Sequence, residues 1–217
     1  MNLTFFNGRL SNFGKKETMK SRYLLLLLLG CFAFGQVGIP TKTLWQKDLP
    51  KGFHFSGQFF KGLQWTDAHG DNALFLTETG IYESGAHKNA ELFAYHFING
   101  AMQPDWTVYD GEKDCPVDVE ASFTGSAIAI TDLDADGVSE VWLVYKMACR
   151  GDVSPRAMKI IMYECTQKYA MRGEEKLIMG EQVTGGEYEL DAAFKTAPRT
   201  IRDYAVKQWK RYAKWRL

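Results

Sequence analysis

Residues 127–146, AIAITDLDADGVSEVWLVYK, constrain the fold strongly. Two apolar runs rich in β-branched and aromatic residues, which favour strands, flank an acidic loop. The loop carries carboxylates at Asp132, Asp134, Asp136 and Glu140. Gly137 permits a sharp bend among them. Oxygen ligands on alternate residues, closed by a glycine turn, suit calcium, so the stretch predicts a Ca2+ site at the tip of a β-hairpin.

The order D-x-D-x-D-G also opens the EF-hand, which needs a bidentate Glu at the twelfth position and a helix on each side. Here the twelfth position is Leu143, within an apolar run. We therefore do not expect an EF-hand.

The longer pattern D-x-D-x-D-G-x-x-E between strands resembles the calcium loops of FG-GAP and VCBS repeats, the blades of integrin-type propellers. The resemblance implies a backbone carbonyl ligand from Val138. It also implies side-chain ligands from Asp132, Asp134, Asp136 and Glu140. The alternative is an acidic turn that binds nothing, in which crowded carboxylates would repel one another.

A weak internal repeat supports a fold that is built of β-hairpins. Residues 64–76, QWTDAHGDNALFL, repeat the order strand, Thr-Asp, acidic glycine loop and strand seen at residues 130–144. The two stretches resemble divergent copies of a blade-like unit, with Asp67 and Asp71 retained in a shorter first loop. Two units cannot close a propeller, which needs about four blades. We expect a mainly β fold with one open antiparallel sheet or two packed sheets.

The N-terminal region predicts export. From Met19 the chain reads MKSRYLLLLLLGCFAFGQ, with basic residues, an apolar run and then small residues, the order of a secretory signal. Cleavage before Gln36 is favoured over a lipobox reading in which Cys31 carries a lipid. Residues 1–35 are thus an upstream extension and signal peptide, and residues 36–217 a single domain in the periplasm or on the cell surface.

The net charge of the chain restricts the kinds of partner molecule that it is expected to bind. Residues 1–35 hold five of the 26 basic and one of the 26 acidic residues, so the remaining chain carries about −4. This balance argues against nucleic acid as a partner. Basic residues gather near the end, because residues 195–217 contain eight of them and only Asp203 as an acid.

Three cysteines remain after the signal, namely Cys115, Cys149 and Cys165. In an exported protein an odd number predicts one disulfide and one free thiol. All three pairings are open. We favour Cys115 with Cys149, because both flank the acidic hairpin and a bridge would tie its base to the neighbouring segment.

The body from Leu44 reads as strands separated by Gly, Asp, Asn and Pro turns. The expected strands include residues 52–65, 73–84, 91–98 and 106–110, with a further hairpin formed by residues 158–164 and 168–173.

An amphipathic helix is expected over residues 198–216. Its apolar face would carry Ile201, Tyr204, Ala205, Trp209, Tyr212 and Trp215, and its other face the basic residues. The helix either closes over the sheet or docks on an anionic membrane or glycan. We favour the first, because the second leaves a large aromatic patch exposed.

Catalytic signals are weak. The four histidines lack metal-ligand spacing, and His54 and His96, which lie in apolar runs, are expected to be partly buried. Glu187 and Glu189 would point the same way in a strand, as a glycosidase pair could. The triplet at residues 150–152, Arg-Gly-Asp, is read as a tight turn, with integrin-type adhesion as its alternative.

The run TDLDADGVSEVWLVYKMACRGDVSPRAMKIIMYE, followed by KYAMRG, is similar to a family of small exported proteins of Bacteroidetes-type bacteria. Some members carry a label that ties them to surface polysaccharide biosynthesis. Taking the chain as a whole, we expect a calcium-stabilised, non-enzymatic binding or assembly protein of the envelope or periplasm, with a surface glycan or another envelope protein as partner. A carbohydrate-active envelope enzyme is the alternative.

Overall fold

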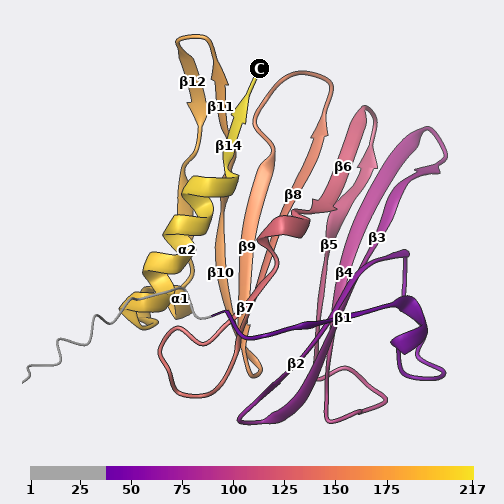
Figure 1. Cartoon of the computed structure of the whole chain (residues 1–217). Coiled ribbons are helices and arrows are strands. Elements are labelled where there is room, and N and C mark those ends of the chain that lie inside the picture. Colours follow the sequence, from indigo (N-terminus) through magenta and orange to yellow (C-terminus); the bar gives the residue numbers. More distant parts are fainter. Residues whose placement is uncertain (1–37) are drawn as a thin grey trace, which may run out of the picture. The chain divides into compact units, whose positions relative to one another are not determined.

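Two antiparallel sheets dominate the structure, a computed structural model whose described residues are 38–217 (Figure 1). The predicted signal peptide, both predicted cleavage positions and Cys31 lie outside the described residues. The prediction of a mainly β chain with antiparallel sheets and a C-terminal helix is confirmed.

The first sheet is a meander in which each strand pairs with the next along the chain. Its order is β1 (Lys42–Leu44), β2 (Gln58–Asp67), β3 (Gly70–Ser84), β4 (His87–Ile98) and β5 (Trp106–Cys115). The connections from β2 to β3 and from β3 to β4 are turns of two residues, which antiparallel neighbours allow.

The second sheet has the order β13 (Tyr188–Leu190), β10 (Gln167–Glu174), β9 (Ala157–Glu164), β8 (Glu140–Arg150) and β6 (Asp118–Phe123), and β7 (Ala129–Thr131) also pairs with β8. A small third sheet contains β12 (Gln182–Gly185), β11 (Lys176–Met179) and β14 (Lys214–Arg216). The helical segments are η1 (Gln46–Asp48), η2 (Gly125–Ala127), α1 (Ala192–Thr196) and α2 (Arg199–Tyr212).

The main core lies between the two large sheets. In β4, Ala90, Leu92 and Ala94 face this core, and the alternate residues face outward, as the period of a strand requires. Strand β8 is apolar on both faces, because Leu143 enters the core between the sheets and Trp142 enters a second core under α2. This double burial explains the unbroken apolar run after Glu140.

Helix α2 covers the second sheet, which confirms the closing-helix interpretation (Figure 1). Its buried residues are Ile201, Tyr204, Ala205, Gln208 and Trp209. The expected extension to residue 216 is wrong: the helix ends at Tyr212, and Trp215 belongs to β14, which pairs parallel with β11. The Trp215 ring lies 4.7 Å from the Arg150 guanidinium, a cation–π contact. From residue 38 onward, no helix has both the length and the apolar character needed to cross a bilayer.

A disulfide joins Cys115 to Cys149, with Cα atoms 5.6 Å apart, so the favoured pairing is confirmed. Cys115 ends β5 and Cys149 lies near the end of β8, so the bridge connects the two sheets. It therefore joins the sheets at the end of β8 remote from the acidic loop, and does not tie the base of the hairpin.

The outer face of the first sheet is partly covered by residues 45–57. Phe53 packs edge-on against Tyr95 and Phe97, with ring centroids 5.1 and 5.0 Å apart. The expectation that residues 52–57 belong to a strand is wrong, because β2 begins at Gln58. The expected burial of His54 is also wrong, since that side chain is exposed, whereas His96 is buried as expected.

Candidate metal site and the adjacent pocket

The acidic loop connects β7 to β8, and the pair Thr131 and Glu140 closes the ladder at its base. Strands on both sides rule out an EF-hand. Gly137 has a φ of 85°, a left-handed conformation in which glycine is unstrained. The backbone therefore turns at Gly137, where the alternating carboxylates need a bend to face one another.

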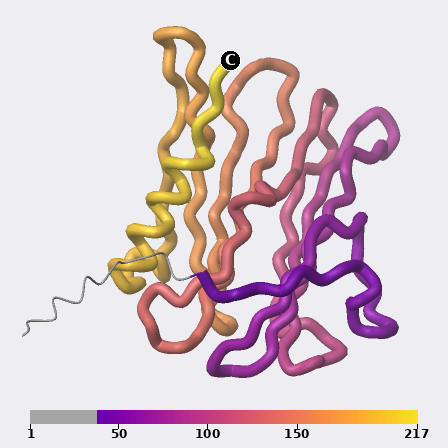
Figure 2. The backbone as a smooth tube through the Cα atoms, viewed as in Figure 1, coloured from indigo at the N-terminus to yellow at the C-terminus, as the bar shows by residue number. Residues whose placement is uncertain are grey.

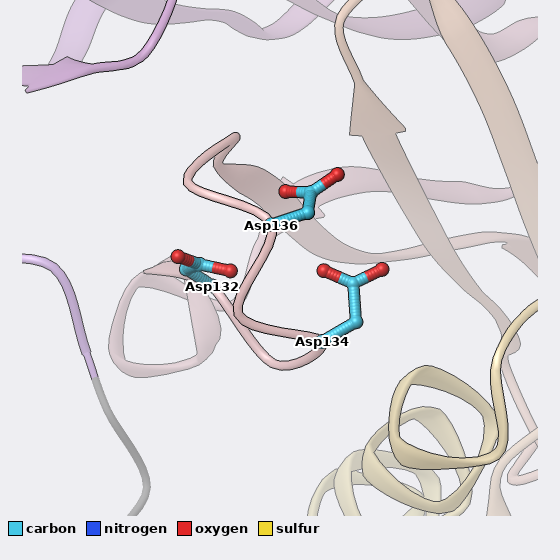
Figure 3. Close-up of side chains that lie close together, drawn as sticks. All are labelled: Asp132, Asp134 and Asp136. Atoms are coloured by element: carbon cyan, nitrogen blue, oxygen red, sulfur yellow. The ribbon is translucent and has the colours of Figure 1, made fainter.

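Three carboxylates converge in the loop. Asp132, Asp134 and Asp136 each place an oxygen within 4.8 Å of the others, and their side chains project from one curved stretch of chain (Figure 3). Asp132 Oδ2 accepts a hydrogen bond from Gly137 N at 3.1 Å. Its other oxygen, Oδ1, is buried and has no hydrogen-bond partner within residues 38–217. A buried carboxylate oxygen without a donor is costly unless a cation satisfies it.

A second group contains Asp134, Glu140 and Glu164, again within 4.8 Å. Glu164 ends β9 and lies opposite Glu140 in the register of the β8–β9 pair. Asp134 is common to both groups, so four other carboxylates lie around it and the cluster contains five in all. The loop pattern contains no signal for Glu164, since only the strand register brings it there.

Glu140 also organises the base of the loop. Its carboxylate accepts hydrogen bonds from Thr131 Oγ1 at 2.5 Å and from Leu133 N at 2.9 Å. Thr131 in turn accepts from Trp142 Nε1 at 2.8 Å. Because the side chain is fully buried, desolvation raises the pKa of Glu140 to about 7.

The neighbouring carboxylates are perturbed in the same direction. Burial, followed by the charges of Asp136 and Asp132, raises the pKa of Asp134. Burial and the charges of the loop also raise the pKa of Glu164. Full ionisation of this cluster is therefore unfavourable without a positive charge to compensate it.

The ligand role of Val138 stays a prediction, as do the ligand roles of the four carboxylates. The amide of Val138 donates to Asp136 Oδ1 at 2.7 Å, which helps to fix the turn. No contact of its carbonyl oxygen within the described chain bears on a metal.

The turn between β2 and β3 clamps the acidic loop. Asp67 Oδ2 accepts hydrogen bonds from Ser139 Oγ at 2.5 Å and from Ser139 N at 3.2 Å. Ala68 N donates to Gly137 O at 2.9 Å. Neither carboxylate group found among residues 38–217 includes Asp67 or Asp71. The shorter loop thus positions the acidic loop from the opposite sheet.

A pocket of about 220 Å³ lies beside this clamp, between the two sheets. The acidic loop and the turns after β2, β4 and β9 gather at this end of the strands (Figure 2). The first sheet contributes His69, Asn72, His96 and Trp106, and the second contributes Ser139 and Cys165.

Cys165 and His69 touch at the mouth of the pocket, where Sγ and Nε2 are 3.4 Å apart. Burial and nearby carboxylates raise the pKa of the Cys165 thiol. A thiol held protonated at neutral pH is a poor nucleophile, so this pair does not form an activated Cys–His site.

The remaining sequence candidates have structural positions. Asp152 Oδ1 accepts from Ser154 N at 3.0 Å, which confirms the tight turn after Arg150. Glu187 and Glu189 are exposed at β13, an edge strand of the second sheet.

We predict an acid-sensitive contribution from His96. Burial lowers the pKa of His96 to about 4, although Asp105 and Asp67 oppose this shift. A histidine whose folded pKa lies below its unfolded value of about 6.5 stabilises the fold above that pH and loses this contribution as the pH falls toward 4. The expected loss is about 2 kcal/mol, measured from urea unfolding at pH 7 and pH 4.5.

The control for this prediction is His96→Gln, which removes the titrating group. The variant should lose less stability between the two pH values than the wild type. Parallel losses in both proteins would show that His96 does not contribute.

No family model, curated protein or solved structure matches the chain.

Proposed function

We propose that this chain is an exported, calcium-stabilised, non-enzymatic binding or assembly protein of the envelope or periplasm. The observation that supports the proposal is the cluster of five carboxylates, in which four lie around Asp134. Hard cations such as calcium prefer carboxylate oxygens, and the buried Oδ1 of Asp132 has no hydrogen-bond donor among residues 38–217. Calcium is structural here: it offsets the repulsion and holds the loop against the clamp from Asp67.

Export is supported by the disulfide between Cys115 and Cys149. Disulfides persist in oxidising compartments such as the periplasm and are rare in the cytosol. The signal-like sequence from Met19 points in the same direction. A surface glycan or another envelope protein is the proposed partner, on the strength of the family resemblance. The basic face of α2 or a lipid on Cys31 would provide membrane contact.

The test is a pair of thermal melts in excess calcium and in chelator. With a dissociation constant of about 0.1 to 1 mM, as in extracellular sites, 10 mM calcium should stabilise the fold by on the order of 1 to 3 kcal/mol. Asp134→Asn should abolish this gain. It should also raise the melting temperature in chelator, because it removes a charge from the repelling cluster.

Asp71→Asn is the matched control, because it makes the same substitution beside the β2–β3 turn, outside the carboxylate cluster. Calcium should stabilise this variant as much as it stabilises the wild type. Glu164→Gln should shift the calcium titration to higher concentration, because Glu164 belongs to the second carboxylate group. Identical melts of the wild type in calcium and chelator would refute the calcium proposal.

A further inference from the structure

The pocket between the sheets contains two buried polar groups that the metal site does not use. His96 and Trp106 line it and are only 4 % and 7 % exposed. Each has a ring nitrogen that is buried without a hydrogen-bond partner in the part of the chain that the structure describes. Such groups are rare in folded proteins, and an ordered water or a bound ligand commonly completes their hydrogen bonding.

The hydrogen bonds of Asn72 determine which His96 nitrogen carries the proton. Asn72 Nδ2 donates to Gly70 O at 2.9 Å, so Asn72 Oδ1 faces His96 and must accept. His96 Nε2 lies 2.9 Å from that oxygen and is therefore the protonated nitrogen. His96 Nδ1 then carries a lone pair and is an acceptor. The carboxylate of Asp105 lies 3.7 Å from Nδ1 and is also an acceptor, so it cannot satisfy it.

Trp106 provides the complementary group, because its indole Nε1–H can only donate. The two faces of the Trp106 ring are covered by His96 and Tyr163, with centroids 4.8 and 4.0 Å away. A ligand in the pocket therefore meets the edge of this ring and not its face.

The chemistry of the lining restricts the ligand. An unpaired acceptor beside an unpaired donor suits hydroxyl groups, which both donate and accept. Anions are disfavoured by Asp67 and Asp105, which also line the pocket. A simple cation could not accept from the indole of Trp106. The volume is below the range of about 300 to 1,000 Å³ typical of drug-sized ligands, so the ligand is small.

We propose that this pocket binds a small neutral polyhydroxylated ligand, a single pyranose sugar unit, whose hydroxyls donate to His96 Nδ1 and accept from Trp106 Nε1. The inference rests on the binding role proposed above and names the site and the ligand class for it. It does not depend on which glycan, if any, contains the sugar.

The test is a titration of the purified, 15N-labelled protein in calcium, followed through the indole N–H signals. The probes are glucose, galactose and N-acetylglucosamine. Methylammonium and acetate are titrated in parallel to test for a cationic or an anionic ligand instead. At least one sugar should shift the Trp106 signal saturably, with a dissociation constant on the order of 1 mM, as expected for so small a ligand. The Trp142 indole, which already donates to Thr131, should not move.

Trp106→Phe assigns the signal and tests the donor, because it keeps an aromatic ring for the stack and removes the N–H. Sugar binding should weaken about tenfold. Trp45→Phe is the matched control, since Trp45 is 62 % exposed and does not line the pocket, and its affinity should be unchanged. If Trp106→Phe does not fold, the wild-type titration still tests the proposal, through the change in the Trp106 indole signal compared with that of Trp142.

The proposal is overturned if no sugar shifts the Trp106 signal saturably, which would leave a pocket that holds only water. It is also overturned if methylammonium or acetate produces the shift and sugars do not, or if Trp106→Phe binds sugar as the wild type does. Calcium stabilisation in the melts, together with absent sugar binding, would refute this inference alone.

Discussion

Glu175→Leu should destabilise the protein by on the order of 3 to 5 kcal/mol. Glu175 is fully buried and lies between two cations, Lys146 of β8 and Arg156, which precedes β9. Its carboxylate accepts from Arg156 Nε at 2.6 Å, Arg156 Nη2 at 2.9 Å and Lys146 Nζ at 2.5 Å. Removing it leaves Lys146 largely buried beside Arg156 with no countercharge from Glu175. Urea unfolding midpoints of wild type and variant measure the loss.

The electrostatics of Glu175 support a large effect. Burial alone would raise its pKa, but the hydrogen bonds and charges of Arg156 and Lys146 hold the pKa of Glu175 below its ordinary value. The ionised form is thus stabilised by the fold, and this contribution is lost as the pH falls through the depressed pKa.

Asp118→Ala is the matched control for this network. Asp118 also forms an ion pair, with Lys88 Nζ at 3.1 Å, but its side chain is 87 % exposed. Exposed pairs contribute about 0 to 1 kcal/mol, so the control should unfold near the wild-type midpoint. Equal effects of the two substitutions would show that the buried network has no special role.

Loss of the disulfide should have an effect of similar size. The bridge closes a loop of 34 residues between the two sheets, and its removal should cost about 4 kcal/mol through the entropy gained by the unfolded chain. The double substitution of Cys115 and Cys149 by Ala removes the bond without leaving free thiols. Chemical unfolding of this variant, compared with the oxidised wild type, measures the loss.

Cys165→Ser is the control, because Cys165 is free and exposed and its replacement should leave the unfolding midpoint unchanged. A double variant as stable as the oxidised protein would mean that the two sheets hold together without the bridge.

Much of the fold could be predicted because local chemistry and tertiary packing agree. Alternating residues in β4 and the continuous apolar run of β8 both match the layers that cover them. The apolar face of α2 likewise anticipated its packing on the second sheet. The prediction that Trp215 lies in the helix was wrong, because its position also fits the apolar face of a helix. Only the pairing of β14 with β11 places Trp215 in a strand.

The candidate site was predictable where its residues are close in sequence. Asp132, Asp134 and Asp136 alternate within one loop, so their convergence follows from the turn. Glu164 and the clamp from Asp67 come from distant strands, and only the sheet register brings them to the loop. The pocket around His96 was not predictable, because its residues come from both sheets.

A crystal structure of the calcium-loaded protein, with anomalous diffraction to locate calcium, tests the metal site most directly. We expect one anomalous peak among the carboxylates of Asp132, Asp134 and Asp136, with calcium–oxygen distances of about 2.3 to 2.6 Å. At least one oxygen of Glu140 or Glu164 should complete the shell. A calcium-soaked crystal with no peak at this loop would contradict the proposed role of the carboxylate cluster.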